Sequence, residues 1–592
     1  MSAMYRLTIS TAALAATVFA ASPLEDKNRP VATAPAMTAE QTAAALAVPA
    51  GFKVQVVAAE PDVVQPIAMT LDDRGRIWVV TNTNYPASPG EPKDSILIFE
   101  DADGDGRAEK RTVFYDKLTF SSGIAVGHGG VWVGTPPNLL FFADKNGDDK
   151  PDAEPEIVVD GWGGQDTHET LNDFIWGPDG WLYGTQGVFT HSNVGKPGAA
   201  AEQRTPINAG VWRIHPRTRK FELWAEGGSN QWGIDWNDHG EAFFAACVIP
   251  HMWHAIQGAR YHRQAGAHFN KHTYADIKTI AWGRYEKAAY CGMMIYLGDL
   301  FPREYRDTLF FHDIHMNKLR NEIVSRAGSG YQSAKKGDFI VSEDKHFRGL
   351  SPQYGPDGSV FINDWYDKVP CHQQRNFTDR SNGRIYRITS AAAKPVKVDI
   401  AKLSEQELVK LQLHANDWFV RAARLELQER GLGVAGAAEL EDILSKNTDD
   451  TRQLRALWAL HCGGRLSEPT ALKAMKAGSE YVRGWAVTLM NENEKPSEAV
   501  LAEMLRLAKE DSALVRLRVA SALQRVPVAQ RWPILTALAA HEADANDQNL
   551  PLMIWYAAEP AVAADPAKAA ELLGTSKIQK LTEFITRRMA SK

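Results

Sequence analysis

Three side chains with acid–base chemistry stand close together in a Gly-rich stretch of the chain. Residues 161–187 read GWGGQDTHETLNDFIWGPDGWLYGTQG and contain Asp166, His168 and Glu169. Histidine exchanges protons near neutral pH, and a neighbouring carboxylate can orient it. The pattern therefore indicates a general base, His168, steered by Glu169 or Asp166. The alternative is a polar loop whose side chains only hydrogen-bond one another.

Two acidic loops carry oxygen ligands at a spacing that suits calcium. The loops DADGDGRAE and DKNGDDKPD begin at Asp101 and Asp144, and each has oxygen-bearing side chains at positions 1, 3, 5 and 9. Ca²⁺ prefers six to eight oxygens, and glycine lets a short loop wrap around one ion. We expect a structural calcium role, and a solvated acidic hairpin tip is the alternative. The expected ligands are Asp101, Asp103, Asp105, Glu109, Asp144, Asn146, Asp148 and Asp152.

A histidine-rich tract follows further along the chain. Five histidines lie between residues 251 and 272, in PHMWHAIQGARYHRQAGAHFNKH. Such tracts can bind transition metals, but no Cys or carboxylate joins these histidines at a zinc-like spacing. We therefore expect them to line a polar pocket with Trp253, Arg260 and Arg263.

The elements that must position these residues are repeated β units. A glycine turn followed by an aromatic strand recurs at 71–80, 125–134, 176–185, 235–245 and 354–364, and YRDTLFFHD at 305–313 fills the one wide gap. Six units of this length favour a six-bladed β-propeller over residues 48–390, with a closing strand in SNGRIYRIT (381–389). Closure of the ring protects the sheet edges. A pair of β-sandwiches is the alternative.

The composition changes after residue 390, where glycine becomes rarer and alanine and leucine dominate. A Val-Arg or Leu-Arg pair starts four apolar helical faces, at residues 420, 454, 482 and 515. Apolar residues at i, i+3, i+4 and i+7 indicate amphipathic helices, and steps of about 30 residues are typical of stacked helical pairs. We predict a HEAT-like α-solenoid over residues 391–592. Such arrays bind or brace, so we expect no catalysis there.

The composition and the N-terminal residues limit the class of protein and its expected location. A chain of 592 residues is longer than one hydrophobic core usually supports. Its net charge of −6 does not indicate nucleic-acid binding. Residues 1–20 have a basic start, a short apolar run and a small-residue cleavage site near Ala20, which predicts a secretory signal peptide and a periplasmic or secreted protein. Residues 21–47 read as a flexible leader. No later apolar run is long enough to span a membrane.

The spacing of the four cysteines does not indicate which of them could form a disulfide. They are Cys247, Cys291, Cys371 and Cys462. Export permits disulfides, but these positions do not select a pair. No C-x-x-C-H occurs, so we expect no covalently attached c-type haem.

At this point the motifs resemble a known family. The propeller is similar to glucose/sorbosone dehydrogenases, whose characterised members use pyrroloquinoline quinone (PQQ) and calcium, and in which a catalytic His precedes a G-P-D-G-x-L-Y strand as His168 does here. Segments 212–236, 354–367 and 382–389 are similar to the exported PVC-type membrane-bound dehydrogenases, here without the C-terminal cytochrome c. The resemblance covers about residues 48–540. Ser229 replaces the arginine that precedes the family's cofactor-binding asparagine, which corresponds to Asn230.

The resemblance implies a quinone site and a redox activity. It places Asn230, Gln231, Trp232, His251, Arg348 and Asp364 at the cofactor, with Arg348, Lys318 and Arg320 as candidates for holding its carboxylates. The leading hypothesis is an exported sugar or alcohol oxidoreductase that passes electrons to a separate protein such as a cytochrome c. A cofactor-independent carbohydrate hydrolase or lyase using the same pocket is the second hypothesis. A non-enzymatic propeller that binds carbohydrate or protein is the third.

Overall fold

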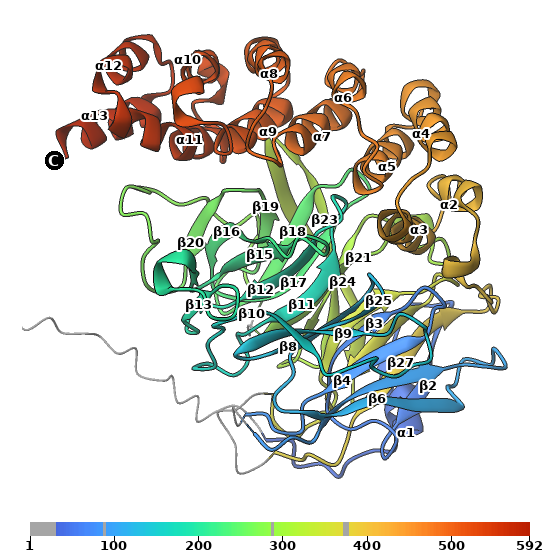
Figure 1. Ribbon diagram of the computed structural model, residues 1–592. Helices are drawn as coiled ribbons and strands as arrows, with labels where there is room; N and C mark the ends of the chain where they lie inside the picture. Colours follow the sequence, from blue (N-terminus) through green and yellow to red (C-terminus); the bar gives the residue numbers. More distant parts are fainter. Residues whose placement is uncertain (1–30, 87–89, 286–288, 371–377, 592) are drawn as a thin grey trace, which may run out of the picture.

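Six β-sheets arranged around a central axis form the larger part of the molecule (Figure 1). The computed structural model describes residues 31–86, 90–285, 289–370 and 378–591. The predicted six-bladed β-propeller is confirmed, and it is followed by a run of helices with the form of an α-solenoid. The predicted signal peptide and Cys371 lie outside the described residues. The three described cysteines form no disulfide with one another.

The first three blades follow one another along the chain. Blade I contains β3 (Pro66–Leu71), β4 (Ile77–Thr81), β5 (Asp94–Glu100) and β6 (Lys110–Leu118). Blade II contains β7 (Gly123–Val126), β8 (Gly130–Thr135), β9 (Asn138–Ala143) and β10 (Glu156–Asp160). Blade III contains β11 (Asn172–Trp176), β12 (Leu182–Gln186), β15 (Gly210–Ile214) and β16 (Phe221–Gly228), and the hairpin β13 (Ser192–Val194) and β14 (Thr205–Ile207) is inserted between its second and third strands.

The last two of the remaining three blades each include a strand from the N-terminal part of the chain. Blade IV contains β17 (Asn230–Trp236), β18 (Ala242–Cys247) and β19 (Met252–Ala255), and β20 (Arg260–Arg263) pairs back onto β16. Blade V contains β21 (Tyr290–Ile295), β22 (Leu309–Asp313), β23 (Lys318–Ala327) and β24 (Gly330–Ser342), with β1 (Leu46–Ala47) at its edge. Blade VI contains β25 (Gly349–Tyr354), β26 (Val360–Asp364) and β27 (Arg384–Ser390), and β2 (Phe52–Ala59) pairs antiparallel with β27. The ring is therefore closed by a strand from the start of the chain.

The helices form two layers along one side of the propeller (Figure 1). The layer nearer the blades contains α3 (Asp417–Arg430), α5 (Asp450–Cys462), α7 (Glu480–Met490), α9 (Ala513–Leu523), α11 (Leu550–Ala564) and α13 (Gln579–Ala590). The outer layer contains α2 (Glu405–Leu411), α4 (Val434–Lys446), α6 (Glu468–Ala474), α8 (Glu498–Glu510), α10 (Trp532–Ala539) and α12 (Pro566–Thr575). All four Val-Arg or Leu-Arg pairs fall on inner helices, and the HEAT assignment stays a prediction.

The solenoid packs on the turns between the first and second strands of the blades. These are the turns that the repeated glycines marked in the sequence. Gly180 and Gly240 have φ angles of +80° and +72°, which favour glycine, and a Cβ at Gly240 would lie 2.4 Å from the ring of Trp458 in α5. The glycines therefore serve both the turn and the close approach of the helices.

Buried ion pairs hold the two parts together. Three arginines from the inner helices α3, α5 and α9 each reach a carboxylate in the β17–β18 segment of blade IV, at N–O distances of 2.8, 2.9 and 2.7 Å. The pairs are Arg421 with Asp235, Arg455 with Asp238, and Arg518 with Glu241. Because these charges are largely withdrawn from water, removing one partner leaves the other costly to bury. The solenoid is thus fixed at one face of the ring.

The N-terminal segment differs from the flexible leader that the sequence predicted. Residues 39–45 form helix α1 (Ala39–Ala45), and Thr38 caps it by accepting a hydrogen bond from the Gln41 amide at 3.2 Å. The carbonyl of Ala34 lies 3.1 Å from His346 Nε2, so this segment packs on blades V and VI. A helix cap and pairing with the sheet order this segment. Its Ala-rich composition gives no sign of either. No helix among the described residues is long and apolar enough to cross a membrane.

Candidate functional site

The propeller has two chemically different faces. The first strand of each blade runs from one face to the other, so the loops that precede these strands lie opposite the turns on which the solenoid packs. His168, Asn230 and Arg348 all belong to such preceding loops or strand starts. A buried apolar cluster includes Trp232, Cys291 and Leu350, which come from three of the first strands around the channel. The predicted catalytic residues therefore lie on the face away from the solenoid.

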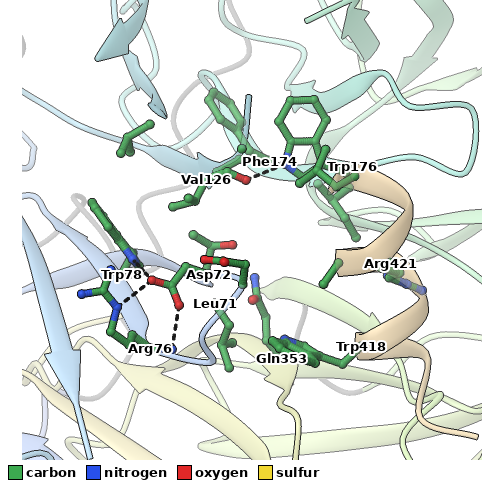
Figure 2. Close-up of a pocket in the computed structure, with 18 of the residues that line it drawn as sticks. Leu71, Asp72, Arg76, Trp78, Val126, Phe174, Trp176, Gln353, Trp418 and Arg421 are labelled. Carbon is green, nitrogen blue, oxygen red and sulfur yellow. Dashed lines mark hydrogen bonds and ion pairs between the residues drawn. The ribbon is translucent and has the colours of Figure 1, made fainter. Parts of the chain in front are cut away.

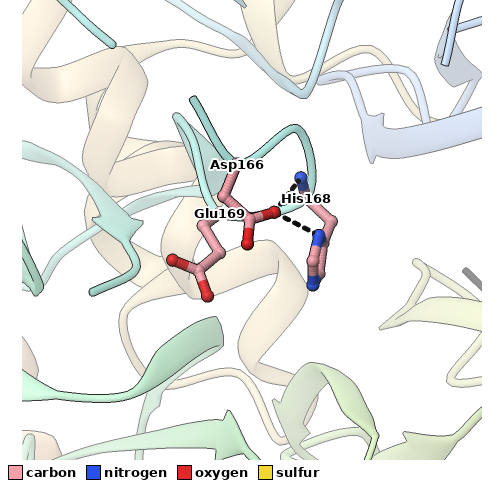
Figure 3. A group of neighbouring side chains, drawn as sticks. All are labelled: Asp166, His168 and Glu169. Atoms are coloured by element: carbon pink, nitrogen blue, oxygen red, sulfur yellow. Dashed lines mark hydrogen bonds and ion pairs between the residues drawn. The ribbon is translucent and has the colours of Figure 1, made fainter. Parts of the chain in front are cut away.

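The side chains of Asp166 and His168 are in ion-pair contact in the loop between β10 and β11 (Figure 3). His168 Nδ1 lies 2.5 Å from Asp166 Oδ1, and the two side chains are 25% and 19% exposed. When Nδ1 donates its proton to this carboxylate, Nε2 is the ring nitrogen that can accept another. Both residues are thus arranged as a base and its orienting carboxylate.

Glu169 has a different environment from its two neighbours. Its side chain is buried, and its Oε2 accepts a hydrogen bond from the Phe189 amide at 2.6 Å. Burial, together with the nearby charge of Asp166, raises the pKa of Glu169 to about 8. One ligand atom from each of Asp166, His168 and Glu169 lies within 4.8 Å of the others. A proton-accepting imidazole therefore stands beside a carboxyl group that holds its proton at pH 7.

Asn172 joins this loop to the next blade, and sequence reasoning missed it. Its Nδ2 donates to the carbonyl of His168 at 3.2 Å and to the carbonyl of Gln231 at 3.3 Å. The predicted cofactor residues Asn230 and Gln231 are thereby fixed beside the His168 loop. Both are buried, and Asn230 Oδ1 and Gln231 Oε1 have no hydrogen-bond partner among the described residues. An amide side chain at the start of a strand, like that of Asn172, was the available signal.

Trp232 and His251 are less exposed than side chains that contact a bound ligand need to be. Trp232 is 8% exposed and belongs to the apolar cluster of the channel. The His251 side chain is fully buried between blades IV and V, and its Nε2 lies 2.8 Å from Glu322 Oε1. Trp282 and Tyr285 donate to the same oxygen, each at 3.0 Å. The environment of His251 is therefore that of a packed hydrogen-bonded core.

Two other histidines of the tract also contact carboxylates. His254 Nε2 lies 2.8 Å from Glu241, and His268 Nδ1 lies 2.8 Å from Glu226. Among the described residues, the tract therefore brings no three metal-ligating side chains together.

Arg348 and Asp364 meet on blade VI, across the channel from His168. Asp364 Oδ1 accepts hydrogen bonds from the amides of Arg348 and Tyr366, at 2.7 and 2.9 Å. Its Oδ2 has no partner among the described residues, and burial raises the pKa of Asp364 to about 7. The Arg348 guanidinium donates to the carbonyls of Phe347 and Lys368.

The other two cations suggested for the quinone are committed elsewhere. Lys318 contacts Asp338 at 2.7 Å, and Arg320 contacts Asp338 at 2.6 Å and Asp313 at 2.7 Å. These ion pairs neutralise both cations within blade V. Arg348 differs from both, since its guanidinium donates to two backbone carbonyls.

The two acidic loops join the third and fourth strands of blades I and II, on the face that carries the solenoid. In the first loop, one carboxylate oxygen from each of Asp101, Asp103, Asp105 and Glu109 lies within 4.8 Å of the others. In the second loop, Asp144, Asp148 and Asp152 form no such group, and the neighbouring Asp149 pairs with Arg76 at 2.7 Å. The first loop fits a cation better, and neither loop is near His168.

Comparisons with known proteins give a family and a fold. The model of a family described as a domain of unknown function, DUF7133, matches residues 38–392. No curated protein matches the chain. Among solved structures, the chain is similar to the apo form of the soluble aldose sugar dehydrogenase of Escherichia coli, with 13% identity, a TM-score of 0.38, and coverage of 57% of this chain and 99% of that one.

Two further solved structures are similar to part of the chain. The PQQ-bound aldose sugar dehydrogenase of Streptomyces coelicolor has 14% identity and a TM-score of 0.36, with coverage of 58% of this chain and 99% of that one. A luciferin-regenerating enzyme has 12% identity and a TM-score of 0.34, with coverage of 59% and 99%. At such identities the likeness concerns the propeller fold alone, since one fold hosts many functions.

Proposed function

Because the chain belongs to the DUF7133 family, whose description gives no activity, we propose from the geometry of its site that the protein is an oxidoreductase acting on a hydroxyl group of a carbohydrate or polyol. The His168–Asp166 pair on the open face of the propeller carries this proposal. In this assignment His168 removes the hydroxyl proton, and Asp166 fixes the tautomer and stabilises the imidazolium that results.

Unsatisfied acceptors on the same face support a substrate rich in hydroxyl groups. Asn230 Oδ1, Gln231 Oε1 and Asp364 Oδ2 are buried without partners among the described residues. A buried acceptor left unpaired costs about 1–3 kcal/mol, so a ligand that donates hydrogen bonds is favoured there. A sugar or polyol donates such bonds from several positions.

The hydride needs an acceptor that the side chains do not provide. A quinone-type cofactor such as PQQ supplies this redox chemistry when bound. The unpartnered amide oxygens of Asn230 and Gln231 accept hydrogen bonds, so they fit a ring N–H of such a cofactor, and Arg348 is the residue proposed to face a cofactor carboxylate. The electrons would then pass to a separate protein such as a cytochrome c.

A second function is favoured by the burial of Glu169 close to His168, which raises the pKa of the Glu169 carboxyl group. A carboxylic acid with a pKa of about 8 beside an imidazole base forms an acid–base pair that needs no cofactor. Such a pair suits a carbohydrate lyase or hydrolase. In that case turnover proceeds without any electron acceptor.

Calorimetric titration with PQQ and Ca²⁺, followed by assays of sugars with a redox dye, separates these functions. Saturable PQQ binding and dye reduction support the oxidoreductase, whereas product formation without dye or quinone supports the lyase or hydrolase. His168→Ala should lower kcat by about 10²–10⁴-fold while leaving the fold intact. His191→Ala, at an exposed imidazole in the neighbouring loop, is the matched control and should keep wild-type turnover. Full turnover by His168→Ala would remove His168 from the mechanism.

We also propose that residues 1–20 direct export to the periplasm or beyond, with cleavage near Ala20. N-terminal sequencing of the protein from the extracytoplasmic fraction tests this proposal. A mature chain that still begins at Met1 would contradict it.

A further inference from the structure

A cavity of about 470 Å³ lies where the solenoid covers the channel, on the face opposite His168 (Figure 2). Turn residues of blades I, II, III and VI and one side of helix α3 line it. Figure 2 shows Val126, Phe174 and Trp176 on one side and Leu71, Gln353 and Trp418 on the other. This volume is within the range of small-molecule sites, about 300–1,000 Å³.

One carboxylate in this cavity has no partner. Asp173 lines the cavity, and neither of its oxygens accepts a hydrogen bond from a described residue. Its φ angle is +58°, and the ladder between β11 and β12 shifts register between Asn172 and Ile175. Bulges of this kind redirect a side chain and are common next to functional sites. An irregular strand thus presents a free carboxylate at the axis of the ring.

Most of the other charges at the cavity are paired or negative. Asp72 binds Arg76 at 2.8 Å, and Asp235 binds Arg421 at 2.8 Å. The lining also includes Asp73, Asp144, Glu426 and Glu429, together with Arg74 and Lys145. Acidic lining residues outnumber basic ones by seven to four. Such a negative lining raises the local concentration of cations.

The walls favour an organic cation over a metal ion. Indole rings of Trp176 and Trp418 and the side chains of Met293, Met294 and Leu425 form much of the surface. No group of metal-ligating side chains among the described residues includes Asp173. Aromatic faces attract organic ammonium groups, and the apolar walls bury the rest of such a molecule.

We propose that this cavity binds a small organic amine with an apolar body, whose ammonium group pairs with Asp173 and whose body packs between Trp176 and Trp418. The site is separate from the proposed catalytic residues, and it does not depend on the oxidoreductase assignment. It joins first strands of the propeller to α3, so its occupant contacts both parts of the molecule.

Calorimetric titration with two matched probes tests this assignment. The probes are 4-phenylbutylamine, which is cationic at pH 8, and the neutral 4-phenylbutan-1-ol. The amine should bind the full chain saturably and at least tenfold more tightly than the alcohol. Asp173→Asn should reduce amine affinity at least tenfold and leave the alcohol unchanged. Asp166→Asn, the same change on the opposite face, is the matched control and should alter neither.

A second measurement needs no variant. Burial, with a contribution from Asp235, raises the pKa of Asp173 to about 7, so this carboxyl is protonated below that pH. Amine affinity for the wild-type protein should therefore fall as pH is lowered from 8 to 6, whereas alcohol affinity should stay constant. The assignment is overturned if neither probe binds saturably, if the alcohol binds as tightly as the amine, or if Asp173→Asn binds the amine like the wild type. Glucose binding that Asp173→Asn alone weakens, with amine binding unchanged, would overturn it in favour of a neutral polyol.

Discussion

Replacing Arg421 by methionine should loosen the contact between solenoid and propeller. Its guanidinium contacts Asp235 at 2.8 Å and Asp417 at 2.7 Å, and it donates to the Trp236 carbonyl at 3.2 Å. After the substitution, Asp417 still contacts Arg455 at 3.1 Å, whereas Asp235 retains only hydrogen bonds from backbone amides. The Asp235 side chain is 3% exposed, so its charge would be left buried. Breaking such a pair costs about 3–5 kcal/mol.

The magnitude can be measured locally by native-state hydrogen exchange of the α3 amides. Local opening energies do not require the whole chain to unfold in one step, which a multidomain chain seldom does. Arg421→Met should lower the opening free energy of α3 by about 3 kcal/mol or more. Adding Asp235→Asn removes the stranded charge and should recover at least about 1 kcal/mol of that loss.

A surface pair provides the control for this experiment. Lys446 contacts Asp442 at 2.8 Å on α4, and both side chains are more than half exposed. Lys446→Met should change exchange by less than about 1 kcal/mol, because exposed pairs contribute little. If Arg421→Met changes α3 exchange no more than Lys446→Met does, the buried pair is not what docks the solenoid.

Three further predictions concern the proposed site and the acidic loops. Asp166→Asn should lower kcat by about 10²–10⁴-fold at unchanged melting temperature, and an unaltered kcat would remove the orienting role. The pKa of Glu169 is raised in the folded state to about 8, so its contribution to stability is present below its unfolded pKa and is lost as pH rises to 8. Urea unfolding should therefore show the wild type losing stability from pH 5 to 9 relative to Glu169→Gln. Parallel pH profiles of the two proteins would contradict this. Calcium should raise the melting temperature, and Asp101→Asn should abolish that rise more completely than Asp144→Asn does, because only the first loop gathers its carboxylates; equal effects would refute the distinction.

The six blades could be predicted because their signals are local. Gly75, Gly180, Gly240 and Gly358 all lie in turns between the first two strands of a blade, with φ angles between +72° and +80°. Turn chemistry and the aromatic strand that follows are readable within ten residues. The closing partner was not readable, because β2 pairs with β27 across more than 300 residues.

The candidate site was predicted in part for the same reason. Asp166, His168 and Glu169 are neighbours in sequence, and the structure keeps them within reach of one another. His251 was expected at the cofactor, but it is paired with Glu322, which comes from another blade. Lys318 and Arg320 are likewise occupied by Asp338, a partner that no motif indicated.

The sequence by itself determined the repeat, the helical segments and the composition of the His168 loop, because turn preferences and hydrophobic periodicity act over a few residues. Tertiary structure alone decided which charges are paired and which are left open. Asp235 and Asp173 are both aspartates of first strands, yet one meets Arg421 and the other faces a cavity without a partner. That difference depends on where α3 packs, since burial and a charged neighbour from a distant segment set the state of a carboxyl group.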